Sequence, residues 1–262
     1  MSAWSASPDD ARAGAPPMGF FGKRKDPAGA TPRAAHTPAY LAPYQEAVDE
    51  AGATFESLLW RNKDFQRIRF DALTDTGFVQ DRVVADLGCG RADLLARWIE
   101  RRVPYAGYVG VEGVPELASF CRDRLEREKQ PNAAIEEADF AADRRLFDRL
   151  IREHGVSVLL FSGSLNTFTQ KAATDLLDRA WQSLTRHAEA NPNAPAKTLV
   201  FNFLSSYAAK EGEDLGPAHR FDTQAMLSWA LGRTPRVRFR HDYLEGRDAT
   251  IAMDTPGERW AE

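Results

Sequence analysis

Small and acidic residues recur within one short stretch of this sequence, at a spacing suited to ligand binding. Asp86, Gly88 and Gly90 stand at every second position, and Asp93 follows three residues later. Glycines let a ligand approach the main chain closely, and carboxylates on both sides of a turn attract positive charge. The pattern therefore predicts a site for a cationic ligand, because two acids make a poor host for a diphosphate.

The residues around this turn predict the elements that position it. Residues 83–87 are apolar apart from Asp86, which is typical of a buried parallel strand. Apolar residues then recur at helical spacing over residues 94–99, which would place one helix face against a sheet. A dinucleotide-binding turn needs a glycine where Asp93 stands, so the sequence disfavours an oxidoreductase that uses a nicotinamide.

The run from Asp86 to Gly90, DLGCG, resembles the first motif of class I S-adenosylmethionine-dependent methyltransferases, D-x-G-x-G-x-G. Ala92 stands in place of the last glycine of that motif. S-adenosylmethionine carries a sulfonium and an ammonium group, so it is a cationic ligand of the kind that the two acids favour. Glu112 ends the next expected strand, where an acid can accept hydrogen bonds from both ribose hydroxyls, and this matches the second motif of the family.

The resemblance implies a Rossmann-like α/β fold: a seven-stranded, mostly parallel sheet with a late antiparallel hairpin and helices on both faces. The short connection between the last two strands also predicts that they pair antiparallel. Helices over about residues 40–74 precede the first strand, and in many members of the family such helices cover the cofactor. The expected strands lie at residues 83–87, 107–112, 133–137, 156–161, 197–204, 237–241 and 249–253.

Further cofactor contacts follow from the same resemblance. Gln66 and Arg69 lie on a leading helix, where they would reach the carboxylate of the cofactor; the alternative is that both face water. An acid after the third strand would accept from the adenine amino group, and Asp139 holds that place with Phe140 beside the ring. The alternative role for Asp139 is to cap a helix that begins at Ala141.

The apolar run at residues 156–161 predicts a central strand that leads to Ser162 and Asn166 at the ligand-binding edge of the sheet. We expect Ser162 to contact the cofactor. Asn166 and His241 are the better placed catalytic candidates, although each also suits an ordinary structural role at a strand end. Residues 205–220 have little apolar content and predict a mobile loop near the acceptor. The full set of acceptor-side candidates is Asn166, Tyr207, His219 and His241.

Composition narrows the domain organisation and the location of the chain. Residues 1–36 are rich in Ala, Pro, Gly and Ser, which favours a disordered tail ahead of a methyltransferase-like domain at residues 37–262. Cys89 and Cys121 lack the partners that a zinc site needs, so we expect two reduced thiols and no metal. No apolar run approaches the length of a membrane span or of a secretion signal, which favours a cytoplasmic protein.

The charge balance bears on the methyl acceptor. A net charge of −4 argues against a general nucleic-acid-binding surface, and the pattern Asn/Asp-Pro-Pro-Tyr/Phe of DNA amino-methylating enzymes is absent. The sequence therefore predicts an S-adenosylmethionine-dependent methyltransferase that acts on a small molecule or a protein, with the small molecule favoured. The alternative is a methyltransferase-like binding module that has lost catalysis. The oligomeric state is left open.

Overall fold

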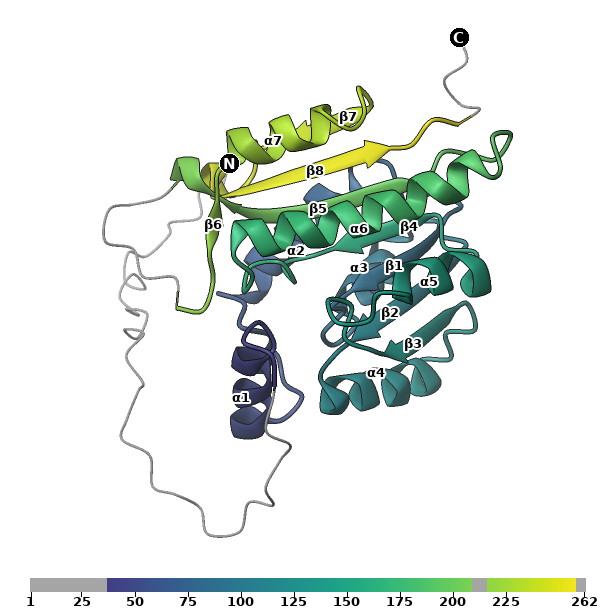
Figure 1. Cartoon of the computed structure of the whole chain (residues 1–262). Coiled ribbons are helices and arrows are strands. Elements are labelled where there is room, and N and C mark those ends of the chain that lie inside the picture. The colour runs from purple at the N-terminus through teal and green to yellow at the C-terminus, as the bar shows by residue number, and fades with distance from the viewer. Residues whose placement is uncertain (1–36, 209–215, 258–262) are drawn as a thin grey trace, which may run out of the picture. The chain divides into compact units, whose positions relative to one another are not determined.

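A mixed eight-stranded sheet organises the computed structural model, which describes residues 37–208 and 216–257 (Figure 1). Seven strands follow the order β3-β2-β1-β4-β5-β8-β7, and β6 pairs with β5 off this path. The strands are β1 (Val83–Leu87), β2 (Gly107–Glu112), β3 (Ala133–Glu137), β4 (Val158–Phe161), β5 (Thr198–Ser205), β6 (Arg220–Phe221), β7 (Val237–Arg240) and β8 (Asp248–Asp254).

Helices cover both faces of this sheet, and three short 3₁₀ turns complete the described elements. The helices are α1 (Ala42–Ala51), α2 (Lys63–Thr74), α3 (Asp93–Arg101), α4 (Pro115–Arg127), α5 (Leu146–His154), α6 (Gln170–Glu189) and α7 (Thr223–Leu231). The 3₁₀ turns are η1 (Glu56–Leu58), η2 (Ser206–Ala208) and η3 (Leu244–Gly246). Within the described residues, no helix combines the length and the apolar character that a membrane crossing requires.

The two apolar layers follow from the alternation of side chains along each strand. Ala85 and Leu159 face one layer, which packs against α5, α6 and α7. Val84 and Leu160 face the other layer, which packs against α2, α3 and α4. Burial on both sides explains why β1 and β4 read as nearly continuous apolar runs in the sequence.

The sheet confirms the predicted Rossmann-like fold. All seven expected strands are present, β1 to β5 pair in parallel, and β8 is antiparallel to both β5 and β7. The additional strand β6 begins at Arg220, the last residue of the stretch 205–220 that was expected to be a loop. Two residues are too short for a periodic pattern, so the sequence carried no signal for it. The expected tail at residues 1–36 and the middle of the loop, residues 209–215, lie outside the described residues.

Two expected helices have different bounds in the structure. The leading helix divides at Gly52, whose φ of +69° ends α1 and leads into η1. The helix expected from Ala141 begins only at Leu146. Asp139 caps the turn that precedes Leu146, because its Oδ1 accepts hydrogen bonds from the main-chain N–H of Ala141 at 2.9 Å and of Ala142 at 3.0 Å. Asp139 therefore caps a turn, and the expected capping of a helix is not observed, because α5 has Arg145 at its N-cap.

Candidate cofactor-binding site

The glycine turn after β1 has a backbone that side chains fit poorly. Gly88 and Gly90 have φ values of +79° and +57°, in the left-handed region. A Cβ on Gly88 would lie 2.6 Å from Cβ of Ser164, and one on Gly90 would lie 2.8 Å from a methyl carbon of Leu58. Ala92, at the place of the third glycine of the motif, also has a positive φ of +56°. The turn therefore has the conformation that the glycine spacing predicts.

Glu112 at the end of β2 ties this turn to the sheet. Its Oε2 accepts a hydrogen bond from the N–H of Gly90 at 2.8 Å, and its Oε1 accepts from the N–H of Val114 at 2.9 Å. Burial raises the pKa of the Glu112 carboxyl to about 7, although the backbone hydrogen bonds act in the opposite direction. Each oxygen keeps a second lone pair, so the carboxylate can also accept a ligand hydroxyl.

Asp86 near the end of β1 is buried with only one of its two carboxylate oxygens hydrogen-bonded. Tyr108 donates its hydroxyl to Oδ2 of Asp86 at 2.8 Å. The other oxygen, Oδ1, is buried and has no hydrogen-bond partner among the described residues. Burial, with a smaller contribution from the negative charge of Glu112, raises the pKa of Asp86 to about 7, although the Tyr108 hydrogen bond acts in the opposite direction. A buried carboxylate oxygen without a donor is costly unless a ligand supplies one.

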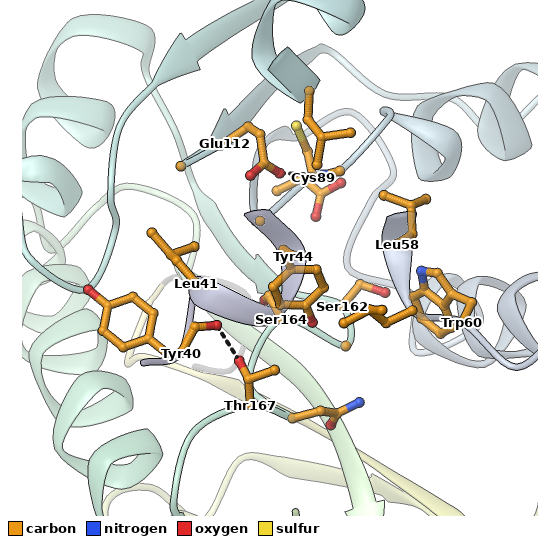
Figure 2. A pocket seen from close by; sticks show the side chains of 18 of the residues that line it. Tyr40, Leu41, Tyr44, Leu58, Trp60, Cys89, Glu112, Ser162, Ser164 and Thr167 are labelled. Atoms are coloured by element: carbon orange, nitrogen blue, oxygen red, sulfur yellow. Dashed lines mark hydrogen bonds between the residues drawn. The ribbon is translucent and has the colours of Figure 1, made fainter. Parts of the chain in front are cut away.

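One cavity brings most of the predicted site residues together at the carboxyl ends of β1, β2 and β4 (Figure 2). Figure 2 shows Glu112 and Cys89 on one side of this cavity, and Tyr40 and Thr167 on another. The predicted residues that line it are Gln66, Arg69, Asp86, Gly88, Gly90, Glu112, Asp139, Phe140, Ser162 and Asn166. Strand ends far apart in the sequence thus meet at the edge where open α/β sheets bind ligands.

Three polar side chains after β4 also lack partners in this cavity. The hydroxyl oxygens of Ser162 and Ser164 and the Oδ1 of Asn166 are buried and have no hydrogen-bond partner among the described residues. The main chain of this loop is held in place, because the N–H of Gly163 donates to Oδ1 of Asn202 at 2.7 Å. The loop therefore presents fixed polar groups that a bound ligand can satisfy.

His241, the other catalytic candidate, lies away from Asn166. It is absent from the cavity lining, and its Nε2 lies 2.8 Å from the Oγ of Ser205. The structure does not bring His241 into the cavity with Asn166, because β7 stands at the edge of the sheet, beyond β8, and a catalytic role for either residue stays a prediction. Tyr207 is 69% exposed and packs edge-on against His241. His219 reaches Asn166 only through its main chain, whose N–H donates to the Asn166 carbonyl at 2.7 Å.

Arg69 and Gln66 line the cavity but already have partners within the protein. The Nε and Nη2 atoms of Arg69 lie 2.7 Å and 3.0 Å from the two carboxylate oxygens of Asp248. Its guanidinium also lies over the Trp60 ring, 4.8 Å from the centroid. Gln66 donates to Asp93 at 3.5 Å. Contact of either residue with a cofactor carboxylate stays a prediction.

The comparisons with known proteins agree on the fold. No protein-family model matches the sequence, and no curated protein sequence matches it. An O-methyltransferase family protein from Burkholderia thailandensis superposes with a TM-score of 0.59 at 16% identity, over 83% of this chain and 64% of that one. The chain has the fold of a class I S-adenosylmethionine-dependent methyltransferase.

Two further solved structures share this methyltransferase fold. Phosphoethanolamine N-methyltransferase 1 from Haemonchus contortus gives a TM-score of 0.58 at 10% identity, over 85% of this chain and 49% of that one. The S-adenosylmethionine-dependent methyltransferase SibL gives a TM-score of 0.56 at 14% identity, over 81% of this chain and 62% of that one. The chain spans less than two thirds of the length of each of these three proteins.

The residues present fit the cofactor that this methyltransferase fold implies. The glycine turn leaves no room for a side chain, so a ligand can lie against its main chain. The unpartnered Oδ1 of Asp86 suits an ammonium group, and Glu112 suits ribose hydroxyls. Asp139 accepts the hydroxyl of Tyr40 at 2.6 Å, so its proposed contact with adenine would share that carboxylate.

The sequence did not predict which side chains cover the site. A strap formed by residues 40–60, which include α1 and η1, borders the cavity, and Figure 2 shows its side chains Tyr40, Leu41, Tyr44, Leu58 and Trp60. Leu58 lies against Gly90, Leu41 against Gly113, and Trp60 against Gly163. Thr167 fastens the start of the strap by donating to the Tyr40 carbonyl at 2.9 Å. Helical spacing indicated the elements, whereas these contacts depend on residues distant in the sequence.

Proposed function

We propose that this protein is an S-adenosylmethionine-dependent methyltransferase that acts on a small molecule bearing an N–H or O–H group. The observation that carries the proposal is the unpartnered, buried Oδ1 of Asp86 in a cavity that also contains the glycine turn and Glu112. A cationic nucleoside supplies the ammonium group and the ribose hydroxyls that these carboxylates lack.

The charges that line the cavity support a cationic ligand. Asp86, Glu112 and Asp139 contribute three carboxyl groups, whereas the only basic side chain among the described lining residues is Arg69. Asp248 already neutralises Arg69. A nicotinamide dinucleotide would bring a diphosphate into this acidic surrounding, which opposes its binding.

The chemistry asks mainly for alignment and exclusion of water. When bound, S-adenosylmethionine supplies a methyl group on a positively charged sulfur, which is already an activated leaving group. Glu112 would hold the ribose, and the strap residues Leu58 and Trp60 would exclude water. Asn166 would accept a hydrogen bond from the acceptor through Oδ1, which orients the attacking lone pair.

The enclosure of the cavity favours a small acceptor. Tyr40, Tyr44 and Trp60 line the cavity from the strap, and Pro217 and Ala218 line it from the chain before β6. Tyr44 is half-buried, and burial raises the pKa of its hydroxyl to about 12. A compact molecule fits between these walls without displacing the strap from the glycine turn.

Calorimetric titration followed by a transfer assay tests the proposal. We expect S-adenosylmethionine and S-adenosylhomocysteine to bind with one-to-one stoichiometry and NAD to give no binding heat. With methyl-labelled S-adenosylmethionine and a cell extract, the label should enter the small-molecule fraction, and Asn166→Ala should lower the transfer more than the binding. Binding of NAD instead would refute the cofactor assignment. Label recovered only in the protein fraction would refute the small-molecule acceptor, and binding without any transfer would indicate a non-catalytic module.

A further inference from the structure

A second cleft lies against α2 and α3 and shares Gln66 and Phe70 with the lining of the cofactor cavity. Its lining is strongly basic, in contrast to the acidic cavity beside it. Five basic side chains border the cleft, against two acidic ones, Asp93 and Glu100. The five are Lys63, Arg67, Arg91, Arg97 and Arg124.

Two of the five basic side chains are neutralised by acids. Arg97 makes a two-pronged contact with Asp71, with N···O distances of 2.9 Å and 2.7 Å, and also contacts Glu100 at 2.8 Å. Arg124 contacts Asp93 at 2.8 Å and Glu128 at 2.9 Å. Both acidic side chains of the cleft take part in these ion pairs. The positive charges of Arg97 and Arg124 are therefore already balanced within the protein.

The other three basic side chains have no ion-pair partner among the described residues. Lys63 and Arg91 lie over aromatic rings instead, those of Phe55 at 5.6 Å and Phe120 at 4.7 Å. The Nε of Arg91 is buried and has no hydrogen-bond partner among the described residues. Arg67 is exposed and lies one helical turn after Lys63 on α2, on the same side of that helix.

We propose that this cleft binds the phosphate group of a small phosphorylated molecule. Arginine and lysine side chains are the usual partners of phosphate oxygens, and three positive charges outside the described ion pairs match a di- or trianion. Phe55 offers apolar surface to the organic part of such a ligand. The site is separate from the proposed methyl transfer, since it needs neither Asp86 nor Glu112.

Pyrophosphate is the probe that tests this site. We expect the full-length protein to bind it with one-to-one stoichiometry in a calorimetric titration at constant ionic strength. The double variant Lys63→Ala/Arg67→Ala should weaken this binding at least tenfold. The matched control, Arg122→Ala/Arg127→Ala, removes two exposed charges from α4 outside the cleft and should change the dissociation constant less than twofold.

Two outcomes would overturn the proposal. Equal weakening in both double variants would show that pyrophosphate responds only to the overall charge of the protein. No binding to the wild type above that of sulfate would show that the cleft has no preference for phosphate. A titration of the same variants with S-adenosylhomocysteine separates this test from the methyltransferase proposal. Its affinity should stay unchanged, and a parallel tenfold loss would make the cleft part of the cofactor site.

Discussion

Asp86 and Asp254 are both buried carboxylates of the same sheet, but they differ in position and in their partners. Asp86 lies near the carboxyl ends of the parallel strands, and Asp254 lies near their amino ends. Asp254 ends β8 opposite the start of β5. Its Oδ1 accepts from Thr198 at 2.6 Å, and Arg238 donates to both of its oxygens at 3.0 Å and 2.9 Å. Asp86 has one partner, Tyr108, and one oxygen without any among the described residues.

The contrast separates a structural carboxylate from one prepared for a ligand. Around Asp254 the protein itself supplies a hydrogen-bond donor to each carboxylate oxygen, which favours the folded state. Around Asp86 the protein leaves hydrogen-bonding capacity unused, and burial raises the pKa of that carboxyl to about 7. A site that binds a cation must accept this cost in the free protein, because the ligand repays it only on binding.

The largest expected effect is the loss of stability in Asp254→Ala. Without this carboxylate, Thr198 and Arg238 lose their acceptor, so we expect the free energy of unfolding to fall by about 2–4 kcal/mol. Urea denaturation measures this change. Asp242→Ala, which removes an exposed partner of Arg240, is the control and should leave the denaturation midpoint where it is. Equal denaturation midpoints for Asp254→Ala and Asp242→Ala would show that Asp254 does not stabilise the fold, which would contradict its structural role.

Glu112→Ala should have the largest effect on cofactor binding. The variant loses the ribose contact and also the hydrogen bond that holds Gly90, so binding of S-adenosylhomocysteine should weaken by about 1.5–3 kcal/mol. Calorimetry gives the dissociation constant. Glu137→Ala is a matched control, because Glu137 pairs with Glu112 in the register of β2 and β3 but is exposed. An unchanged constant in folded Glu112→Ala would refute the ribose assignment.

Binding of S-adenosylhomocysteine should depend on pH in a direction set by the two carboxyls. Asp86 and Glu112 both have pKa values raised to about 7, so both are largely protonated in the free protein at pH 6. The ammonium group of the ligand favours the carboxylates, so affinity should rise from pH 6 to pH 7.5, by about tenfold. Titrations across this range measure it. Asp86→Asn should flatten the profile, and a profile that falls with pH would contradict the assignment.

The smallest expected effect concerns the stability of the unliganded protein. Asp86 has a folded-state pKa of about 7, above the ordinary value of 3.8, so its contribution to stability is present at low pH and is lost as pH rises toward 7. The drop in unfolding free energy between pH 6 and pH 8 should therefore be smaller in Asp86→Asn, by about 1.4 kcal/mol. Thermal denaturation at both pH values compares the variants. Identical drops would show that Asp86 has an ordinary pKa in the folded state.

The local sequence pattern predicted the helices and strands well, but it did not predict which side chains of different elements contact one another. The strand at residues 83–87 has the expected bounds, because its burial on both faces is evident from neighbouring residues. Asp86, Glu112 and Asn166 were placed at one edge because parallel strands share their carboxyl ends.

The errors and omissions arose where distant residues decide the outcome. His241 follows β7, and only the order of the strands places β7 at the sheet edge, away from the cavity. Arg69 lines the cavity, and the sequence did not reveal its ion pair with Asp248, which joins residues 179 positions apart. The contact of Leu58 with Gly90 likewise depends on how the strap folds back over the sheet. Because these residues are far apart in the sequence, a local pattern cannot predict their contacts.

A crystal structure with S-adenosylhomocysteine tests the central claim most directly. We predict that both ribose hydroxyls lie within hydrogen-bond distance of Glu112 and that the amino group of the ligand occupies the free side of Asp86. A nucleoside bound elsewhere, or a glycine turn that Leu58 keeps covered while the soaked ligand stays out, would contradict the account.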